Sequence, residues 1–111
     1  MPGRRTARPP RAPSVVVLSR RQAERFLAGD FDDELQEVRE ALAAGLRERR
    51  RRSGLTQAEL AGRVGSSQPR IAAIEAANPG TSLDLLIKCL LAAEATWLEV
   101  AELIGAARKR P

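Results

Sequence analysis

The side chains of this sequence that could do chemistry are mostly arginines. The 111 residues include 19 basic and 14 acidic side chains, a net charge of +5, with no histidine and a single cysteine. Because the usual general bases, metal-ligand clusters and phosphate loops are missing, we predict no enzyme, no cofactor and no metal site. Residues 47–75 carry seven Arg and three Glu, a local charge of +4. Such a basic block favours binding to phosphate groups.

The cysteine and the apolar runs indicate the compartment. Cys89 is the only cysteine, so no internal disulfide can form, and its apolar surroundings favour a role as a small core residue. No apolar run approaches the roughly 20 residues that a membrane-spanning helix needs. We therefore predict a cytoplasmic protein.

The stretch Leu55–Ala77 overlaps the basic block of residues 47–75 and must position whatever that block binds. Its pattern predicts two short helices joined by a sharp turn. Thr56 and Glu59 match a capping box at the start of the first helix. Gly65 can take the left-handed conformation that ends this helix, and Ser67 can cap the next one. Two helices this short need support from the rest of the chain.

Three further helices are expected to give that support within residues 30–107. The longest runs over Asp30–Arg52, with acids at its start and arginines at its end, as suits the helix dipole. Ser82 and Thr96 are predicted caps of the other two helices. Trp97 is interpreted as a core or dimer-interface residue. Apolar spacing marks the buried stripe of the long helix as Leu35, Val38, Leu42 and Leu46.

The ends of the chain differ from this domain in composition. Residues 1–13 are rich in Arg and Pro and are predicted to be a disordered basic arm, either a solvated tail or a segment that follows a phosphate backbone. Residues 14–29 form a leader, with a short strand at Val15–Leu18 and a helix from Ser19 to Ala28. The strand could add to a partner's sheet or lie over the domain. Residues 108–111 are predicted to be a frayed basic tail.

The segment Gly54–Ala76 resembles the helix-turn-helix of the Cro/Xre family of phage-repressor-like DNA-binding proteins. The resemblance rests on Leu-Thr-Gln-Ala-Glu-Leu-Ala, the small Ala61, the turn glycine Gly65, Ser67-Gln68, and Ile71 with Ile74. With the flanking helices it covers about Leu35 to Gly105. It implies an all-α fold, a five-helix lambda-repressor-like domain with its helix-turn-helix core at 56–76 and an N-terminal extension, in a prokaryotic or phage-encoded protein.

The resemblance also implies which residues meet double-stranded DNA, with the helix that begins near Ser67 in the major groove. Gln68 would read a base edge, Arg70 a base or phosphate, and Arg50 and Glu75 would form a structural ion pair. The full base-facing set is Gln68, Pro69, Arg70 and Ala73, and the phosphate-facing set is Gln57, Ser67, Arg49, Arg51, Arg52, Asn78 and Thr81. Because much of the base-facing surface is alanine or proline, specificity is expected to rest on few contacts and on DNA shape.

Two functions fit these observations. The first is a sequence-selective transcriptional regulator, a repressor that acts as a homodimer through the last helix or through Val15–Leu18. The second is the antitoxin of a type II toxin–antitoxin pair, which binds a cognate toxin through the leader and regulates its own operon. The two can hold together, since such antitoxins also bind their own promoter.

Overall fold

The computed structural model describes residues 19–27, 29 and 31–108, and these residues form helices and connecting turns only. The predicted all-α class is confirmed. The chain divides into two units between Asp30 and Phe31. The first contains helix α1 (Arg20–Leu27), which begins with a capping box: the Ser19 amide donates to Gln22 Oε1 at 2.9 Å, and the Gln22 amide donates to Ser19 Oγ at 3.2 Å. The strand predicted at Val15–Leu18 lies outside the described residues.

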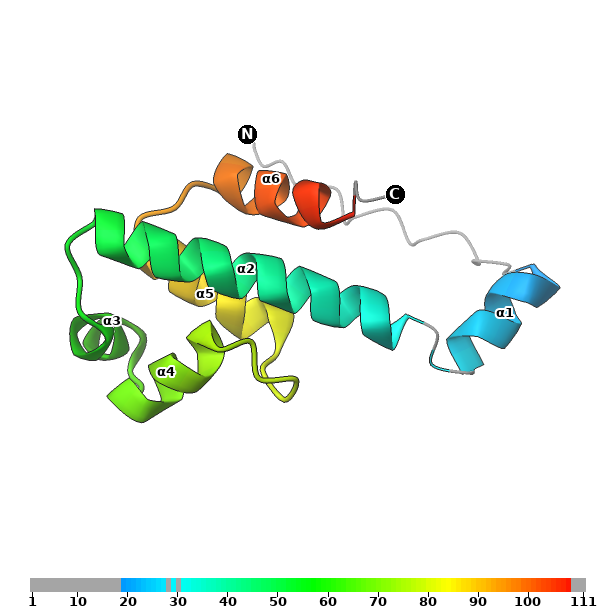
Figure 1. The fold of residues 1–111 in the computed structure, drawn as a ribbon, viewed down its shortest axis with the longest axis horizontal. Coiled ribbons are helices and arrows are strands. Elements are labelled where there is room, and N and C mark those ends of the chain that lie inside the picture. The colour runs from blue at the N-terminus through cyan, green and yellow to red at the C-terminus, as the bar shows by residue number, and fades with distance from the viewer. Residues whose placement is uncertain (1–18, 28, 30, 109–111) are drawn as a thin grey trace, which may run out of the picture. The chain divides into compact units, whose positions relative to one another are not determined.

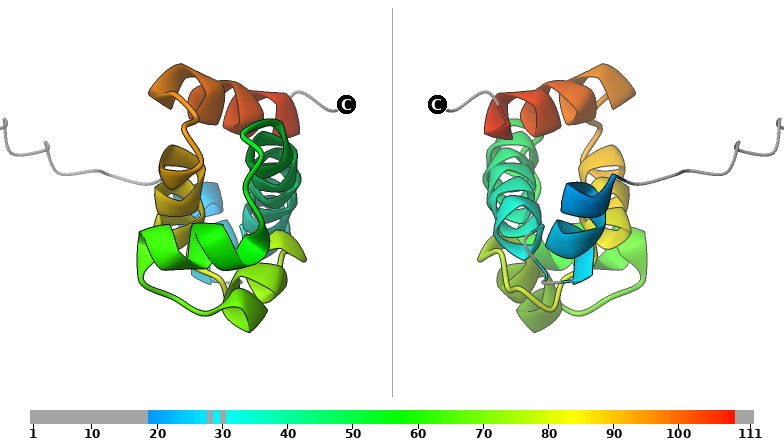
Figure 2. Two further views of the ribbon diagram at one scale, coloured as in Figure 1. Left: turned by 90° about the vertical axis from the view of Figure 1, so that its left-hand side faces the viewer. Right: turned by 90° about the vertical axis from the view of Figure 1, so that its right-hand side faces the viewer.

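The second unit consists of five helices stacked around the longest of them (Figure 1). Helices α2 and α5 lie side by side, α6 packs across one side of this pair, and α3 and α4 pack on the opposite side (Figure 2). The pair α3 and α4 is therefore supported from behind by both α2 and α5. The bounds are α2 Asp32–Arg52, α3 Gln57–Val64, α4 Gln68–Glu75, α5 Leu83–Ala92 and α6 Trp97–Ala107.

A single apolar core lies between these helices, and it fixes the angle of the two short ones. Each helix of the unit contributes buried side chains to it. Burying a side chain of leucine or isoleucine size contributes about 1.5–3 kcal/mol, so this core supplies the support that α3 and α4 lack by themselves. The largest fully buried side chains are Leu42, Leu46, Leu60, Ile71, Ile74, Leu86, Cys89 and Leu90.

Two apolar residues expected to be buried lie at the surface instead. Leu35, in the predicted stripe of the long helix, is 39% exposed, because it lies in the first turn of α2. Trp97 is 68% exposed, so the prediction that it packs in the core is wrong, although its role in a dimer interface stays a prediction. It occupies the first position of α6 beside Leu98, which is 69% exposed.

Helix α6 is fastened to α2 at several points, including an ion pair of 3.6 Å between Arg49 Nη1 and Glu99 Oε2 near the start of α6. At mid-helix, Gly45 lets α2 approach α6 so closely that an added Cβ would lie 2.5 Å from Leu103 Cδ1. At the C-terminal end, the Arg108 guanidinium donates to Glu34 at 2.7 Å and to Glu37 at 2.5 Å. Arg108 is thus anchored rather than frayed as predicted, whereas residues 109–111 lie outside the described part.

The described helices also show what the fold does not contain. None of them is long and apolar enough to cross a membrane. Within the same residues, no group of three or more His, Cys, Asp or Glu side chains is placed to hold a metal ion.

Candidate nucleic-acid interface

The turn between α3 and α4 is built by residues that cap the two helices. Thr56 Oγ1 accepts from the Glu59 amide at 3.0 Å, while Glu59 accepts from the Thr56 amide at 2.8 Å, which completes the predicted capping box. The bond from the Thr56 amide lowers the pKa of the Glu59 carboxyl. Gly65 ends α3 with φ of 69°, in the left-handed region that glycine tolerates.

Helix α4 begins at the surface immediately after this turn. Ser67 caps it, since Ser67 Oγ accepts from the Arg70 amide at 3.4 Å. The side of α4 that carries Ile71 and Ile74 is buried in the core. Ser67, Gln68, Pro69 and Arg70 are exposed. The first turn of α4, at the positive end of the helix dipole, is thus open to a ligand.

The first residues of α3 and α4 are joined by their side chains. Gln68 Nε2 donates to Gln57 Oε1 at 2.7 Å, and Gln57 Nε2 donates to Glu75 Oε1 at 3.1 Å. The two predicted contact residues are therefore held together at one end of the helix pair. Nothing in the sequence spacing signalled the bond from Gln57 to Glu75, because it joins residues 18 positions apart.

Behind these glutamines lies a buried ion pair between α2 and α4. Arg50 Nε donates to Glu75 Oε2 at 2.5 Å, and Arg50 Nη2 donates to Glu75 Oε1 at 3.0 Å. Arg50 Nη1 also donates to the Leu55 carbonyl at 2.9 Å. Burial raises the pKa of Glu75, but hydrogen bonds from Arg50 and Gln57, with the positive charges of Arg50 and Arg47, hold it below its ordinary value. Both side chains therefore stay charged at neutral pH.

A shallow groove runs beside α4 towards the start of α5. Arg70, Ala73 and Asn78 line it, and its volume is about 270 Å³. Asn78 is exposed, and its Oδ1 accepts from the Gly80 amide at 2.8 Å, which fixes the turn after α4. Thr81 lines the same groove but is only 8% exposed, which does not favour its predicted phosphate contact. The Thr81 carbonyl instead accepts from Arg39 at 2.7 Å.

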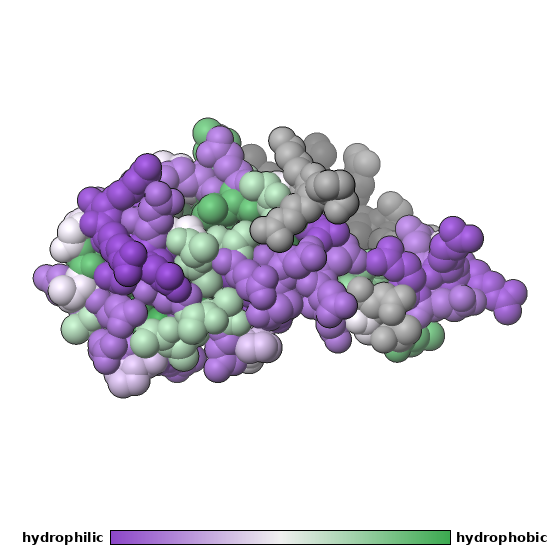
Figure 3. Space-filling model, in the orientation of Figure 1, coloured by the Kyte–Doolittle hydropathy of each residue, from purple (hydrophilic) through white to green (hydrophobic). Residues whose placement is uncertain are grey.

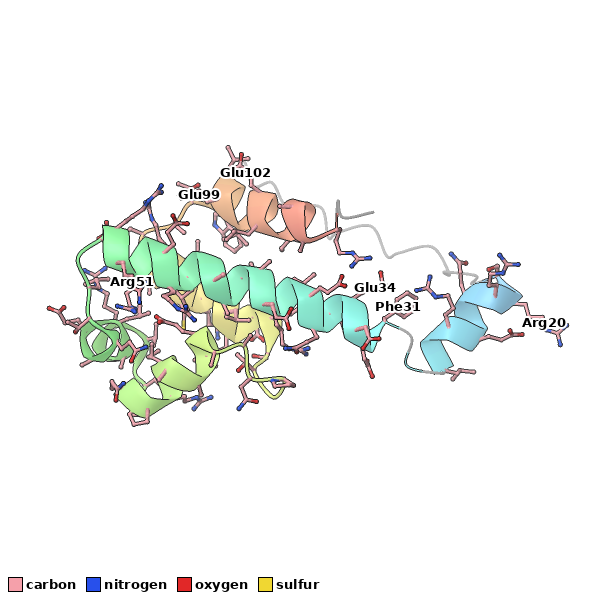
Figure 4. All side chains as sticks on the ribbon, viewed as in Figure 1. Arg20, Phe31, Glu34, Arg51, Glu99 and Glu102 are labelled. Carbon is pink, nitrogen blue, oxygen red and sulfur yellow. The ribbon has the colours of Figure 1, made fainter. Side chains whose placement is uncertain are left out.

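The surface around the end of α2, where Arg49–Arg52 lie, is strongly hydrophilic (Figure 3). These arginines point to different sides of the helix. Figure 4 shows Arg51 at the α3 end of α2, while Glu99 and Glu102 lie on α6 across the helix. Arg49 and Arg52 line a cavity of about 220 Å³ with those two glutamates. Arg49 donates to the Glu94 carbonyl at 2.7 Å, so the geometry does not favour its predicted phosphate contact.

One arginine that sequence reasoning left out lies close to the candidate interface. Arg47 is exposed, and its Nη2 donates to the Glu75 carbonyl at 3.2 Å, near the end of α4. The signal that could have found it is its spacing, because Arg47 and Arg51 are one helical turn apart and share a face of α2.

Two short helices joined by a left-handed glycine, with the second helix presenting an exposed polar start, define a helix-turn-helix protein. Residues 41–106 match a family model described as a helix-turn-helix domain, and the chain belongs to this family of DNA-binding domains. Searches of curated proteins and of solved structures found no match to this chain.

Proposed function

We propose that this protein is a sequence-selective transcriptional regulator of the Cro/Xre type, a repressor that inserts α4 into the major groove of double-stranded DNA. The observation that carries the proposal is the placement of Gln68. It lies exposed at the first position of a capped helix, and Gln57 holds its side chain at 2.7 Å. A glutamine amide in this setting matches the paired donor and acceptor of an adenine edge.

Phosphate contacts on either side would fix the register of α4. The starts of α3 and α4 offer free amides, the Ser67 hydroxyl and the second N–H of Gln57 Nε2. Asn78 and Arg51 are exposed on flanking segments and extend this set. Such contacts give affinity without sequence information.

Base reading in this proposal is limited to few positions. Pro69 offers no hydrogen bond, and Ala73 is half-buried in the groove beside α4. Gln68 and Arg70 therefore carry the direct contacts, and DNA shape supplies the remaining discrimination.

A homodimer completes the proposal, because one helix of eight residues buries little DNA surface. Trp97 and Leu98 are 68% and 69% exposed at the start of α6, and adjacent apolar side chains of this size favour an interface. The other candidate, Val15–Leu18, lies outside the described residues.

The test is selection of bound sequences from a random DNA pool, followed by affinity measurements on the enriched site. Replacing Gln68 and Arg70 together by Ala should abolish the preference for this site over random DNA. Lys88→Ala is the matched control, since it removes one exposed positive charge on α5 and should leave the preference intact. An unchanged preference in the double variant would refute the assignment.

The antitoxin alternative is favoured by the leader helix. Helix α1 exposes Leu27, which is 83% accessible, and the unit that contains it is separate from the DNA-binding unit. A helix with an open apolar residue is suited to a protein partner. Co-purification of a toxin from native cells, lost on deletion of residues 1–30 with DNA binding retained, would support this role. Recovery of no partner with the full chain would argue against it.

A further inference from the structure

We propose that Glu75, acting through Gln57, fixes the edge that Gln68 presents to DNA and so makes the site select adenine over guanine. The inference rests on the proposed function and names a positioning residue for it. Glu75 lies on the buried side of α4 and is 4% exposed, so it does not itself face the DNA in the proposed complex. Its influence reaches the surface through two hydrogen bonds.

The first step follows from the chemistry of the buried ion pair. A guanidinium only donates hydrogen bonds and a carboxylate only accepts them. Arg50 and Glu75 are bonded at two points, 2.5 and 3.0 Å, so the carboxylate must stay ionised and turned towards Arg50. Anything else that bonds to Glu75 Oε1 must be a donor.

The second step carries this constraint to Gln57. Its side chain lies 3.1 Å from Glu75 Oε1, so it must offer Nε2 there and not Oε1. Because the oxygen and the nitrogen of an amide diverge from the same carbon, an Nε2 bonded to Glu75 leaves Oε1 directed elsewhere, and here it faces Gln68. An oxygen at that place accepts and cannot donate.

The third step sets the amide of Gln68. With an acceptor 2.7 Å away, Gln68 must turn Nε2 towards Gln57. One N–H of Nε2 and the whole of Oε1 remain for DNA. This donor and acceptor match N7 and the N6 amino group of adenine. Guanine offers N7 and O6, both acceptors, so Oε1 of Gln68 would face O6 and be repelled.

The opposite orientation would read the opposite base. If Gln57 offered Nε2 to Gln68, then Gln68 would turn Oε1 inward and present two N–H groups, which suit guanine. The buried carboxylate forbids this arrangement before DNA arrives. Because the orientation is set in advance, binding does not pay to order the amide.

The experiment first finds the base pair of the selected site at which Gln68→Ala abolishes the sequence preference. It then compares the DNA affinity of each variant for sites that carry adenine or guanine at that position. The unmodified protein should prefer adenine by about tenfold or more, as good bidentate contacts discriminate. Gln57→Leu and the paired replacement Arg50→Met with Glu75→Leu each free the Gln68 amide. Both should lower the adenine-to-guanine ratio at least about threefold, while Lys88→Ala should not. The paired replacement keeps the site filled by apolar groups, so the domain should stay folded.

A second measurement needs no DNA. The two side-chain N–H signals of Gln68, followed by ¹⁵N NMR, should shift in both relay variants and stay in place in Lys88→Ala. The relay variants are Gln57→Leu and the paired replacement of Arg50 and Glu75. If they fold but keep the full adenine preference, or keep the Gln68 signals of the unmodified protein, this inference is overturned while the proposed function stands. Shifted signals in a protein that distinguishes no DNA sequence would overturn the proposed function and this inference with it.

Discussion

The buried ion pair between Arg50 and Glu75 makes the sharpest prediction about stability. Arg50 is 8% exposed and Glu75 is 4% exposed, so replacing Arg50 by Met leaves a carboxylate buried without its cation. Breaking such a pair on one side costs about 3–5 kcal/mol. The unit that begins at Phe31 has the size of a small domain, for which total stability is on the order of 4–12 kcal/mol. The single change should therefore remove a large part of it.

Replacing both partners should cost far less than replacing one. With Arg50→Met and Glu75→Leu together, no charge is left buried and the volume is roughly kept, so stability should stay within about 1–2 kcal/mol of the unmodified protein or exceed it. The two changes are thus strongly coupled, by about 2 kcal/mol or more.

Urea unfolding at pH 7, followed by circular dichroism, measures both effects. Arg108→Met is the matched control, because Arg108 is bonded to two carboxylates but its side chain is 43% exposed. Its loss should cost at most about 1 kcal/mol. If Arg50→Met costs no more than Arg108→Met, the pair is effectively solvated and the reasoning fails.

Three further outcomes are expected. Gly45→Ala should destabilise the protein by about 1 kcal/mol, because the clash with Leu103 outweighs the gain in helix propensity; with Leu103→Ala present, urea unfolding should show the sign reversed. The pKa of Glu75 is lower in the folded than in the unfolded chain, so its contribution should be complete at neutral pH and be lost as the pH falls from about 4.5; a pH series of unfolding curves checks this, and the variant without the pair should lack that loss. Arg51→Gln should reduce the salt dependence of DNA affinity by about one phosphate contact, whereas Arg49→Gln should leave it unchanged, as titrations at several salt concentrations would show.

The parts of the fold that depend on residues close together in the sequence could be predicted from it. The capping box of Thr56 and Glu59, the left-handed Gly65 and the caps Ser67, Ser82 and Thr96 were all placed correctly. Each rests on a bond between residues at most a few positions apart. Such a bond is favoured by local backbone geometry whatever surrounds it.

The parts that depend on packing could not be predicted in the same way. A helical stripe shows that a face is apolar, but it does not show how far along the helix the neighbouring elements reach, and so Leu35 was placed inside. Trp97 was expected in the core or at a dimer interface because large aromatic side chains bury much apolar surface, and the sequence did not decide between the two. The burial of Thr81 likewise depends on how the turn after α4 folds against Arg39 of α2, more than 40 residues away.

The arginine run Arg49–Arg52 shows how the same limit affects function. Successive residues on an α-helix are separated by about 100°, so four adjacent arginines cannot form one patch. Arg50 is bonded to Glu75, Arg49 is bonded to the Glu94 carbonyl, and Arg52 lines the cavity with α6. Arg51 and Arg52 remain exposed, but Arg52 lies beside Glu99 and Glu102 of α6, which leaves Arg51 as the exposed arginine of this run that faces away from that cavity. The local charge of the sequence therefore overstates the charge that DNA would meet. In the proposed complex, hydrogen bonds at the starts of α3 and α4 must supply more of the affinity than the density of arginine suggests.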